Sequence, residues 1–152
     1  MIVVDVNILA FYFLEGEKTA DVNNLRKIDA DWIVPNFWLI EFQSILWKYV
    51  RFGGMEESQA LLLLERCRKI IGVNEHVPSP ESVLGDALSL GITVYDAQYV
   101  SLAKQLEIPC ITEDVPLQKA CPGLALSIKD YVAFHSGKSS LRERRGTYRT
   151  QK

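Results

Sequence analysis

The sequence predicts an α/β fold, a three-layer α/β/α sandwich built around a central, mostly parallel sheet. Short β-branched runs, such as Ile2-Val3-Val4 and Trp32-Ile33-Val34, alternate along the chain with longer segments of helical periodicity. These runs are apolar throughout, which indicates strands buried on both faces, as in a parallel sheet. The length of 152 residues and the apolar content of 48% fit a single globular domain.

In the first half of the chain, helices are predicted between and after these two strands. Residues 7–14 and 20–28 are expected to form the first two helices. Asn36 is placed to cap a third helix that ends at Gly53-Gly54, since asparagine accepts hydrogen bonds at helix starts and glycine favours helix ends. A fourth helix is expected over residues 56–71, where apolar side chains recur at helical spacing.

Strands and helices continue to alternate in the second half. Pro80 is expected to open a helix that ends at Gly91, because proline suits the first helical turn. The other predicted elements are a weak strand at residues 72–77, a helix at 95–106, a strand at 110–112, a short helix at 115–120, a strand at 124–128 and a last helix at 129–134.

The cysteines and the N-terminal segment indicate the cellular compartment in which the protein is expected. Three cysteines, odd in number and widely spaced, indicate reduced thiols in a cytoplasmic protein. With two histidines in the chain, a structural zinc site would lack ligands. Residues 1–14 are apolar but lack the basic leader of a signal peptide and are too short to span a membrane. We therefore expect a buried strand followed by a helix there, and no membrane association.

Charge is distributed unevenly along the chain. Residues 138–152 carry six basic residues and one acid, whereas residues 1–137 carry eleven basic and eighteen acidic residues, a net charge of −7. We expect residues 1–137 to form the folded domain and residues 138–152 to be a basic, disordered tail. Because an acidic body does not attract a polyanion by bulk charge, nucleic-acid binding would need local compensation, for which bound divalent metal is a candidate.

Two acids directly follow predicted strands. Asp5 comes after Ile2-Val3-Val4, and Asp114 comes shortly after the strand at residues 110–112. In an open parallel sheet, ligands collect at the carboxyl ends of strands, where the strand order reverses. If these two strands are neighbours, both carboxylates lie at the same crevice.

Two further acids lie in apolar surroundings. Glu41 is enclosed by the aromatic and aliphatic residues 37–42, and Asp96 precedes a largely apolar helix. A buried carboxylate needs a cation or a strong hydrogen-bond partner. Several carboxylates in one cleft are stable when a divalent cation neutralises them, and Mg²⁺ and Mn²⁺ prefer such oxygen ligands.

A purely structural role is open for each acid taken alone. Asp5, Asp96 and Asp114 lie at predicted helix starts, where capping and the helix dipole favour acids. Glu41 is harder to explain by capping, although a buried and paired glutamate would also fit. The four acids together, rather than any one of them, favour a metal site.

With their flanking residues, these acids resemble the motifs of PIN domains. Val3–Leu9 is similar to the opening Asp-x-Asn segment of that family, and Ile40-Glu41-Phe42 is similar to its second acidic motif. The segment Gly91–Ala103, followed by Ile111–Asp114, resembles the VapC toxins of bacterial and archaeal toxin–antitoxin pairs. The resemblance covers about residues 1–130 in the expected order.

The resemblance implies a Mg²⁺- or Mn²⁺-dependent endoribonuclease. The implied metal-site acids are Asp5, Glu41, Asp96 and Asp114, with Asn7 and Thr112 as supporting polar residues. Val6 stands where the family often has threonine or serine, so one supporting hydroxyl is missing and metal binding could be weaker. Glu113 adds an acid beside Asp114; position favours Asp114.

The resemblance also implies an RNA substrate, a small antitoxin partner and a homodimer. Two alternatives within the same fold stay open: a non-catalytic PIN-fold binding module and a housekeeping RNA-processing nuclease. A receiver-like or phosphatase-like domain also places aspartate at strand ends. Asp5-Val6-Asn7 lacks the second aspartate that such a domain uses, which argues against it.

Overall fold

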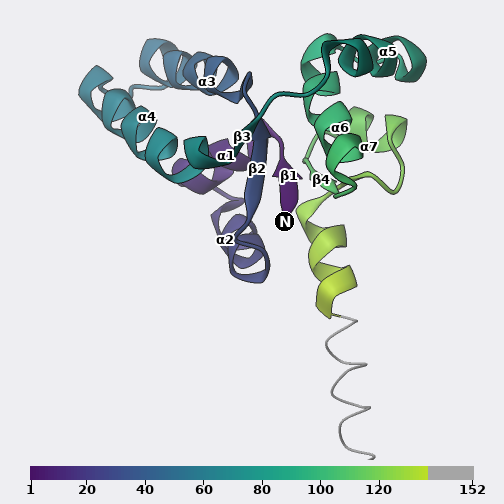
Figure 1. Ribbon diagram of the computed structural model, residues 1–152. Helices are drawn as coiled ribbons and strands as arrows, with labels where there is room; N and C mark the ends of the chain where they lie inside the picture. The colour runs from purple at the N-terminus through teal and green to yellow at the C-terminus, as the bar shows by residue number, and fades with distance from the viewer. Residues whose placement is uncertain (137–152) are drawn as a thin grey trace, which may run out of the picture.

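Five parallel strands form the central layer of the computed structural model, which describes residues 1–136 (Figure 1). They are β1 (Ile2–Val4), β2 (Trp32–Pro35), β3 (Glu75–His76), β4 (Cys110–Ile111) and β5 (Ala125–Leu126). The order across the sheet is β3-β2-β1-β4-β5, and every pairing is parallel. The predicted α/β sandwich with a parallel sheet is therefore confirmed, and the predicted tail at residues 138–152 lies outside the described residues.

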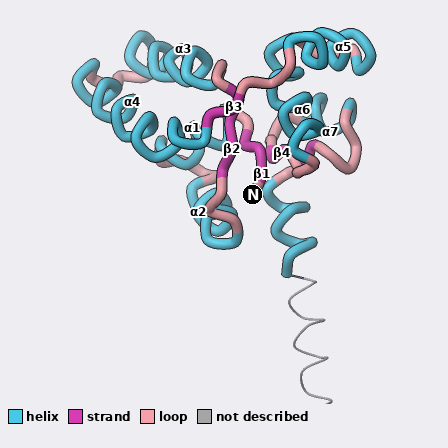
Figure 2. The backbone as a smooth tube through the Cα atoms, viewed as in Figure 1, coloured by secondary structure: helices cyan, strands magenta, loops and turns pink. Residues whose placement is uncertain are grey.

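Helices cover both faces of this sheet (Figure 2). They are α1 (Val6–Phe13), α2 (Thr19–Ile28), α3 (Trp38–Phe52), α4 (Glu57–Ile71), α5 (Pro80–Leu90), α6 (Val94–Leu106) and α7 (Val115–Ala120). A further helix begins at residue 128 and continues to the end of the described residues at 136. Helices α1 to α4 lie on one side of the strands and α5 to α7 on the other (Figure 1). Within residues 1–136, no helix has the length and apolar character needed to cross a membrane.

The alternation of side chains along β1 explains why both faces of the sheet are buried. Ile2 and Val4 pack in a core with α1, α3 and α4, whereas Val3 faces Tyr99 and Leu102 of α6 on the other side. All three β1 residues have no exposed surface. Successive side chains of a strand point to opposite faces, so a continuous apolar run is what a sheet covered on both sides requires.

The strand order reverses between β1 and β4. From β1 the chain moves outward to β2 and β3, and it then returns to the other side of β1 to form β4 and β5. Val3 pairs with Cys110 and Val4 with Ile111 across this junction. The carboxyl ends of β1 and β4 therefore lie side by side, as the sequence predicts, and ligands of open parallel sheets bind at such a point.

The prediction that Asn36 caps the third helix is wrong. Helix α3 begins at Trp38, and Phe37 occupies the cap position without a side-chain hydrogen bond. The backbone N–H of Asn36 instead donates to the carbonyl of His76 at 2.9 Å, so Asn36 continues the pairing of β2 with β3. Pro80 does open α5, and Gly91 ends that helix with a positive φ of 65°, as expected.

Candidate active site

Asp5 lies where β1 passes into α1, with 6% of its surface exposed. Its Oδ1 accepts the backbone N–H of Val6 at 2.6 Å and caps α1. Its Oδ2 accepts the Thr112 hydroxyl at 2.7 Å and the Asn7 side-chain amide at 2.8 Å. The two residues predicted to support the acids thus both donate to Asp5, and they fix the orientation of its carboxylate.

Asp114 is joined to Asp5 through Thr112. The hydroxyl of Thr112 donates to Asp5 and accepts the backbone N–H of Asp114 at 3.1 Å. Asp114 caps α7, because its Oδ1 accepts the N–H of Leu117 at 2.8 Å. No hydrogen bond within residues 1–136 occupies its Oδ2.

Glu113 is engaged elsewhere. Its carboxylate pairs with Lys18 at 2.9 Å and accepts the backbone N–H of Ile128, also at 2.9 Å. These contacts connect the β4 end to α2 and to the helix that starts at residue 128. Of the two neighbouring acids, Asp114 is therefore the one whose carboxylate keeps an oxygen without a protein partner among the described residues.

Glu41 and Asp96 come from the first turns of α3 and α6. Glu41 accepts a hydrogen bond of 2.5 Å from the hydroxyl of Tyr99, which is 1% exposed. Asp96 shares a capping arrangement with Thr93, whose hydroxyl donates to Asp96 Oδ2 at 2.9 Å and accepts the Asp96 N–H at 3.1 Å. The capping role that the sequence left open for three of the acids is therefore observed, since Asp5, Asp96 and Asp114 all cap or border a helix start.

The carboxylates also influence one another electrostatically. Burial, followed by repulsion from Asp96 and Asp114, raises the pKa of Asp5 to about 6, although the hydrogen bonds from Thr112 and Val6 act against this rise. Burial and repulsion from Asp5 and Asp96 raise the pKa of Glu41 to about 7, against the effect of the Tyr99 hydrogen bond. Asp5 therefore lies within electrostatic reach of Glu41, Asp96 and Asp114, and Glu41 lies within reach of Asp96 as well.

Comparison with known proteins shows which proteins this chain resembles. The sequence matches no protein-family model. It is 29% identical over 127 residues to Ribonuclease VapC3 of Pyrobaculum aerophilum, an alignment that covers 81% of this chain and 96% of that protein. The structure superposes on PAE2754 from Pyrobaculum aerophilum with a TM-score of 0.70 and 21% identity, covering 90% of this chain and 96% of that one.

The chain resembles a VapC ribonuclease in sequence and has a PIN-like fold. Its fold is shared with FitAcB from Neisseria gonorrhoeae, with a TM-score of 0.64 and 14% identity over 84% of this chain and 98% of FitAcB. A structure of FitAB bound to the IR36 DNA fragment gives a TM-score of 0.63 at 14% identity, covering 84% of this chain and 95% of that one. The resemblance that the acidic motifs indicated is confirmed. The solved structures have low sequence identity to this chain, so they support a shared fold and nothing further.

The ligand chemistry of this VapC-like PIN domain fits a hard divalent cation. The groups that converge are all oxygen donors, and none of the four acids forms an ion pair with a basic side chain in residues 1–136. The same residues contain no group of three or more His, Cys, Asp or Glu arranged to hold a metal ion together. The four acids therefore offer oxygen ligands of the kind that Mg²⁺ prefers, and within residues 1–136 they do not form a closed protein cage.

Tyr99 is the residue at the site that sequence reasoning missed. It lies three residues after Asp96 on the same face of α6, where its hydroxyl reaches Glu41 on α3. Burial, the nearby carboxylates and this hydrogen bond together raise the pKa of Tyr99, so the phenol stays protonated and donates. The spacing of three residues from a candidate acid, on the same face of the helix, was the available signal.

Proposed function

We propose that this VapC-like PIN domain is a Mg²⁺- or Mn²⁺-dependent endoribonuclease that hydrolyses RNA phosphodiester bonds, and that it is the toxin of a VapBC-type pair. The observation that carries the proposal is the group of mutually repelling carboxylates at the junction of β1 and β4, without a basic partner in residues 1–136. Perturbed pKa values at such a crevice are characteristic of functional sites. The relationship to Ribonuclease VapC3 supports the choice of RNA as substrate.

Asp5, Asp96 and Asp114 are the proposed metal ligands, directly or through water, and Glu41 completes the site. Asp96 Oδ1 and Asp114 Oδ2 accept no hydrogen bond from residues 1–136, so each has an oxygen available to a ligand. Asn7 and Thr112 hold Asp5 in place. Hydrogen bonds of this kind orient a carboxylate that binds metal and strengthen the binding.

A bound divalent ion would lower the pKa of an attacking water and offset charge on the phosphate. Glu41 is the residue that we propose orients that water, because Tyr99 occupies its Oε2 and no residue in the range 1–136 donates to its Oε1. A carboxylate with a pKa of about 7 is also suited to accept a proton near neutral pH. Hydrolysis by water leaves the ribose 2′-OH unused, so the products carry 5′-phosphate and 3′-hydroxyl ends. Cyclic-phosphate products that persist in chelator contradict this mechanism.

The proposed partners are a small antitoxin and a second copy of the chain. Basic side chains of an antitoxin would neutralise the acidic site, in keeping with the net charge of −7 over residues 1–137. Trp47 and Phe52 offer apolar surface on α3: they are 59% and 76% exposed and pack edge to face at 5.7 Å. Trp32 and Trp38, by contrast, are fully buried and contribute to the core.

The test compares Asp96→Asn with Asp130→Asn. Both aspartates share the same capping geometry, since Ser127 donates to Asp130 at 2.7 Å and accepts its N–H at 3.0 Å, as Thr93 does for Asp96. If Asp96 acts only as a cap, both variants cleave RNA like the wild type. We expect Asp96→Asn to lose Mg²⁺- or Mn²⁺-dependent cleavage and Asp130→Asn to retain it.

No difference between Asp96→Asn and the wild type, with neither showing metal-dependent cleavage, would leave the non-catalytic binding module as the better description. The toxin role has a separate test, in which expression of the wild type arrests growth and expression of Asp5→Ala does not. Metal-dependent cleavage without growth arrest would point to a housekeeping nuclease. A short antitoxin-like reading frame directly preceding the gene would support the toxin assignment.

A further inference from the structure

A pocket of about 460 Å³ lies directly beside the carboxylate site, between α3 and the start of α6. It shares Glu41 with that site, and its other principal lining residues are Phe37, Ile40, Ser44, Lys48 and Tyr95. Neither the metal ligands nor the proposed hydrolysis accounts for this hollow. Because it shares Glu41 with the carboxylate site, the pocket is within reach of a chain held there.

An aromatic platform forms one wall of the pocket. The rings of Phe37 and Tyr95 are stacked, with centroids 5.2 Å apart and planes inclined by 24°. Tyr95 is 58% exposed although it directly precedes Asp96, and Ile40 beside it is 58% exposed as well. Stacking on Phe37 fixes the orientation of Tyr95 while leaving much of it accessible to a flat ligand.

Lys48 supplies the positive charge of the pocket. It is exposed, and it forms no ion pair with any residue in the range 1–136. It follows Glu41 on α3 by seven residues, which places it two helical turns, or about 10 Å, further along the helix axis. A cation at that distance is suited to a neighbouring backbone phosphate rather than to the one at the carboxylates.

We propose that this pocket binds a nucleotide of single-stranded RNA next to the cleaved bond, with the base stacked on the Phe37–Tyr95 platform and Lys48 contacting a flanking phosphate. The inference rests on the proposed nuclease function and adds to it the form of the substrate. An aromatic face recognises unpaired bases, because bases within a duplex are already stacked on one another. With one platform and one cation, the pocket favours single strands with little preference among bases.

The test is binding of a short fluorescein-labelled single-stranded RNA to the full chain, measured by anisotropy with Ca²⁺ in place of Mg²⁺ or Mn²⁺ to offset the acidic site, and with the RNA shown by gel to stay intact. Tyr95→Ala is expected to weaken binding by about 5- to 150-fold, the range of one lost base–aromatic stack. Tyr95→Phe keeps the ring and is expected to bind like the wild type. The matched control is Tyr49→Ala, which removes a 44% exposed tyrosine of α3 outside the pocket and is expected to leave binding unchanged.

Two probes separate the base from the phosphate. An RNA of the same length with abasic positions is expected to bind wild type and Tyr95→Ala equally weakly, since the platform then has nothing to stack on. Lys48→Gln is expected to reduce the slope of log affinity against log salt concentration by about 0.7, the contribution of one phosphate contact to a single strand. Lys27→Gln, an exposed lysine of α2 away from the pocket, should leave that slope as it is.

Equal affinity of Tyr95→Ala and wild type for intact RNA would overturn the inference. A protein segment would then be the better candidate for the ligand of this pocket. Loss of affinity that is the same on abasic RNA would overturn it too, because the ring would then act without a base. Failure of the proposed function looks different: a wild type that binds RNA through Tyr95 but cleaves none with Mg²⁺ or Mn²⁺ leaves this inference intact.

Discussion

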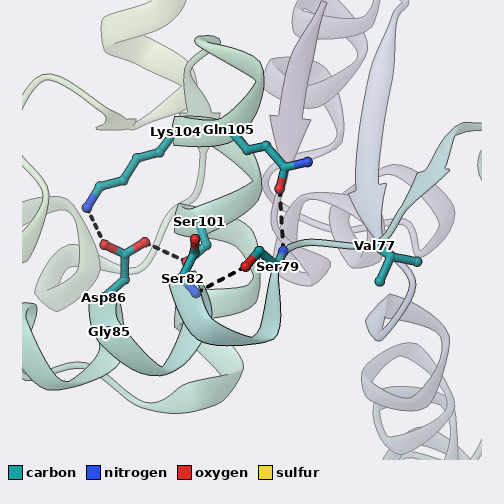
Figure 3. A pocket seen from close by; sticks show the side chains of 8 residues that line it. All are labelled: Val77, Ser79, Ser82, Gly85, Asp86, Ser101, Lys104 and Gln105. Atoms are coloured by element: carbon teal, nitrogen blue, oxygen red, sulfur yellow. Dashed lines mark hydrogen bonds and ion pairs between the residues drawn. The ribbon is translucent and has the colours of Figure 1, made fainter.

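Two groups of shielded carboxylates in this protein have their pKa values shifted in opposite directions. At the junction of β1 and β4, the pKa values of Asp5 and Glu41 rise to about 6 and about 7. Between α5 and α6, Asp86 accepts hydrogen bonds from Lys104 at 2.5 Å and from Ser101 at 2.6 Å (Figure 3). Burial acts to raise the pKa of Asp86. The hydrogen bonds from Lys104 and Ser101, together with the positive charge of Lys104, outweigh burial and lower the pKa.

The difference between the two groups is whether the chain itself supplies the counter-charge. Asp86 lines a pocket of about 630 Å³, larger than the one beside Glu41, yet its charge is balanced by Lys104 across the α5–α6 contact. Asp5, Glu41, Asp96 and Asp114 have no such partner in residues 1–136. A large polar pocket is therefore a weaker sign of function here than an acid whose charge is left for a ligand to offset.

The largest expected effect separates the two groups by activity. Asp5→Asn should lower metal-dependent RNA cleavage by at least about 100-fold, since loss of supporting residues alone costs about 10- to 100-fold at metal sites. Asp86→Asn should leave cleavage within about threefold of the wild type, because its partners lie on α5 and α6 away from the carboxylates. Initial rates on one labelled RNA measure both. Equal losses in the two variants would remove the distinction.

Stability should reverse the ranking. Asp86→Ala breaks the link between α5 and α6 and should lower the free energy of unfolding by about 1–2 kcal/mol, a range reduced for the partial exposure of Lys104. Glu41→Gln keeps an acceptor for Tyr99 and removes a repelled charge, so the metal-free variant should be as stable as the wild type or slightly more stable at pH 8. Urea unfolding in EDTA compares them. A Glu41→Gln variant less stable than Asp86→Ala would contradict the comparison.

The smallest effect concerns pH. The pKa of Glu41 is about 7 in the folded protein against 4.5 ordinarily, and that of Asp5 is about 6 against 3.8. At pH values between the ordinary and the raised pKa, these two carboxyl groups are protonated in the folded state and ionised in the unfolded state. Their contribution to stability is therefore complete below pH 4 and is lost as pH rises through 6 and 7. Asp86, with its lowered pKa, contributes with the opposite sign.

The difference between wild type and Glu41→Gln isolates the Glu41 contribution. In EDTA, the free energy of unfolding of the wild type should fall relative to that of the variant by on the order of 1 kcal/mol between pH 5 and pH 8. Urea unfolding at several pH values measures the difference. A difference that is constant over this range would mean that neither burial nor the neighbouring acids raise the pKa of Glu41.

The sequence was most informative where local chemistry determines structure. The helix from Pro80 to Gly91 was predicted with its exact ends, because proline and glycine act on their own backbone. The positions of Asp5 and Asp114 followed from strand ends. The role of Asn36 could not be predicted in this way, because the hydrogen bond from its N–H to His76 depends on a strand forty residues later. The Tyr99–Glu41 bond likewise joins α6 to α3, which no local pattern encodes.

Calorimetric titration of the metal-free protein with Mn²⁺ at pH 6.5 tests the central claim most directly. If the carboxylates of Asp5, Glu41, Asp96 and Asp114 meet around a divalent ion, Mn²⁺ binds and displaces the protons that Asp5 and Glu41 partly hold at this pH. The heat should then vary with the ionisation enthalpy of the buffer for the wild type, and Asp5→Asn should show no saturable binding. Mn²⁺ binding that is equally strong in Asp5→Asn, or absent from the wild type, would contradict the account.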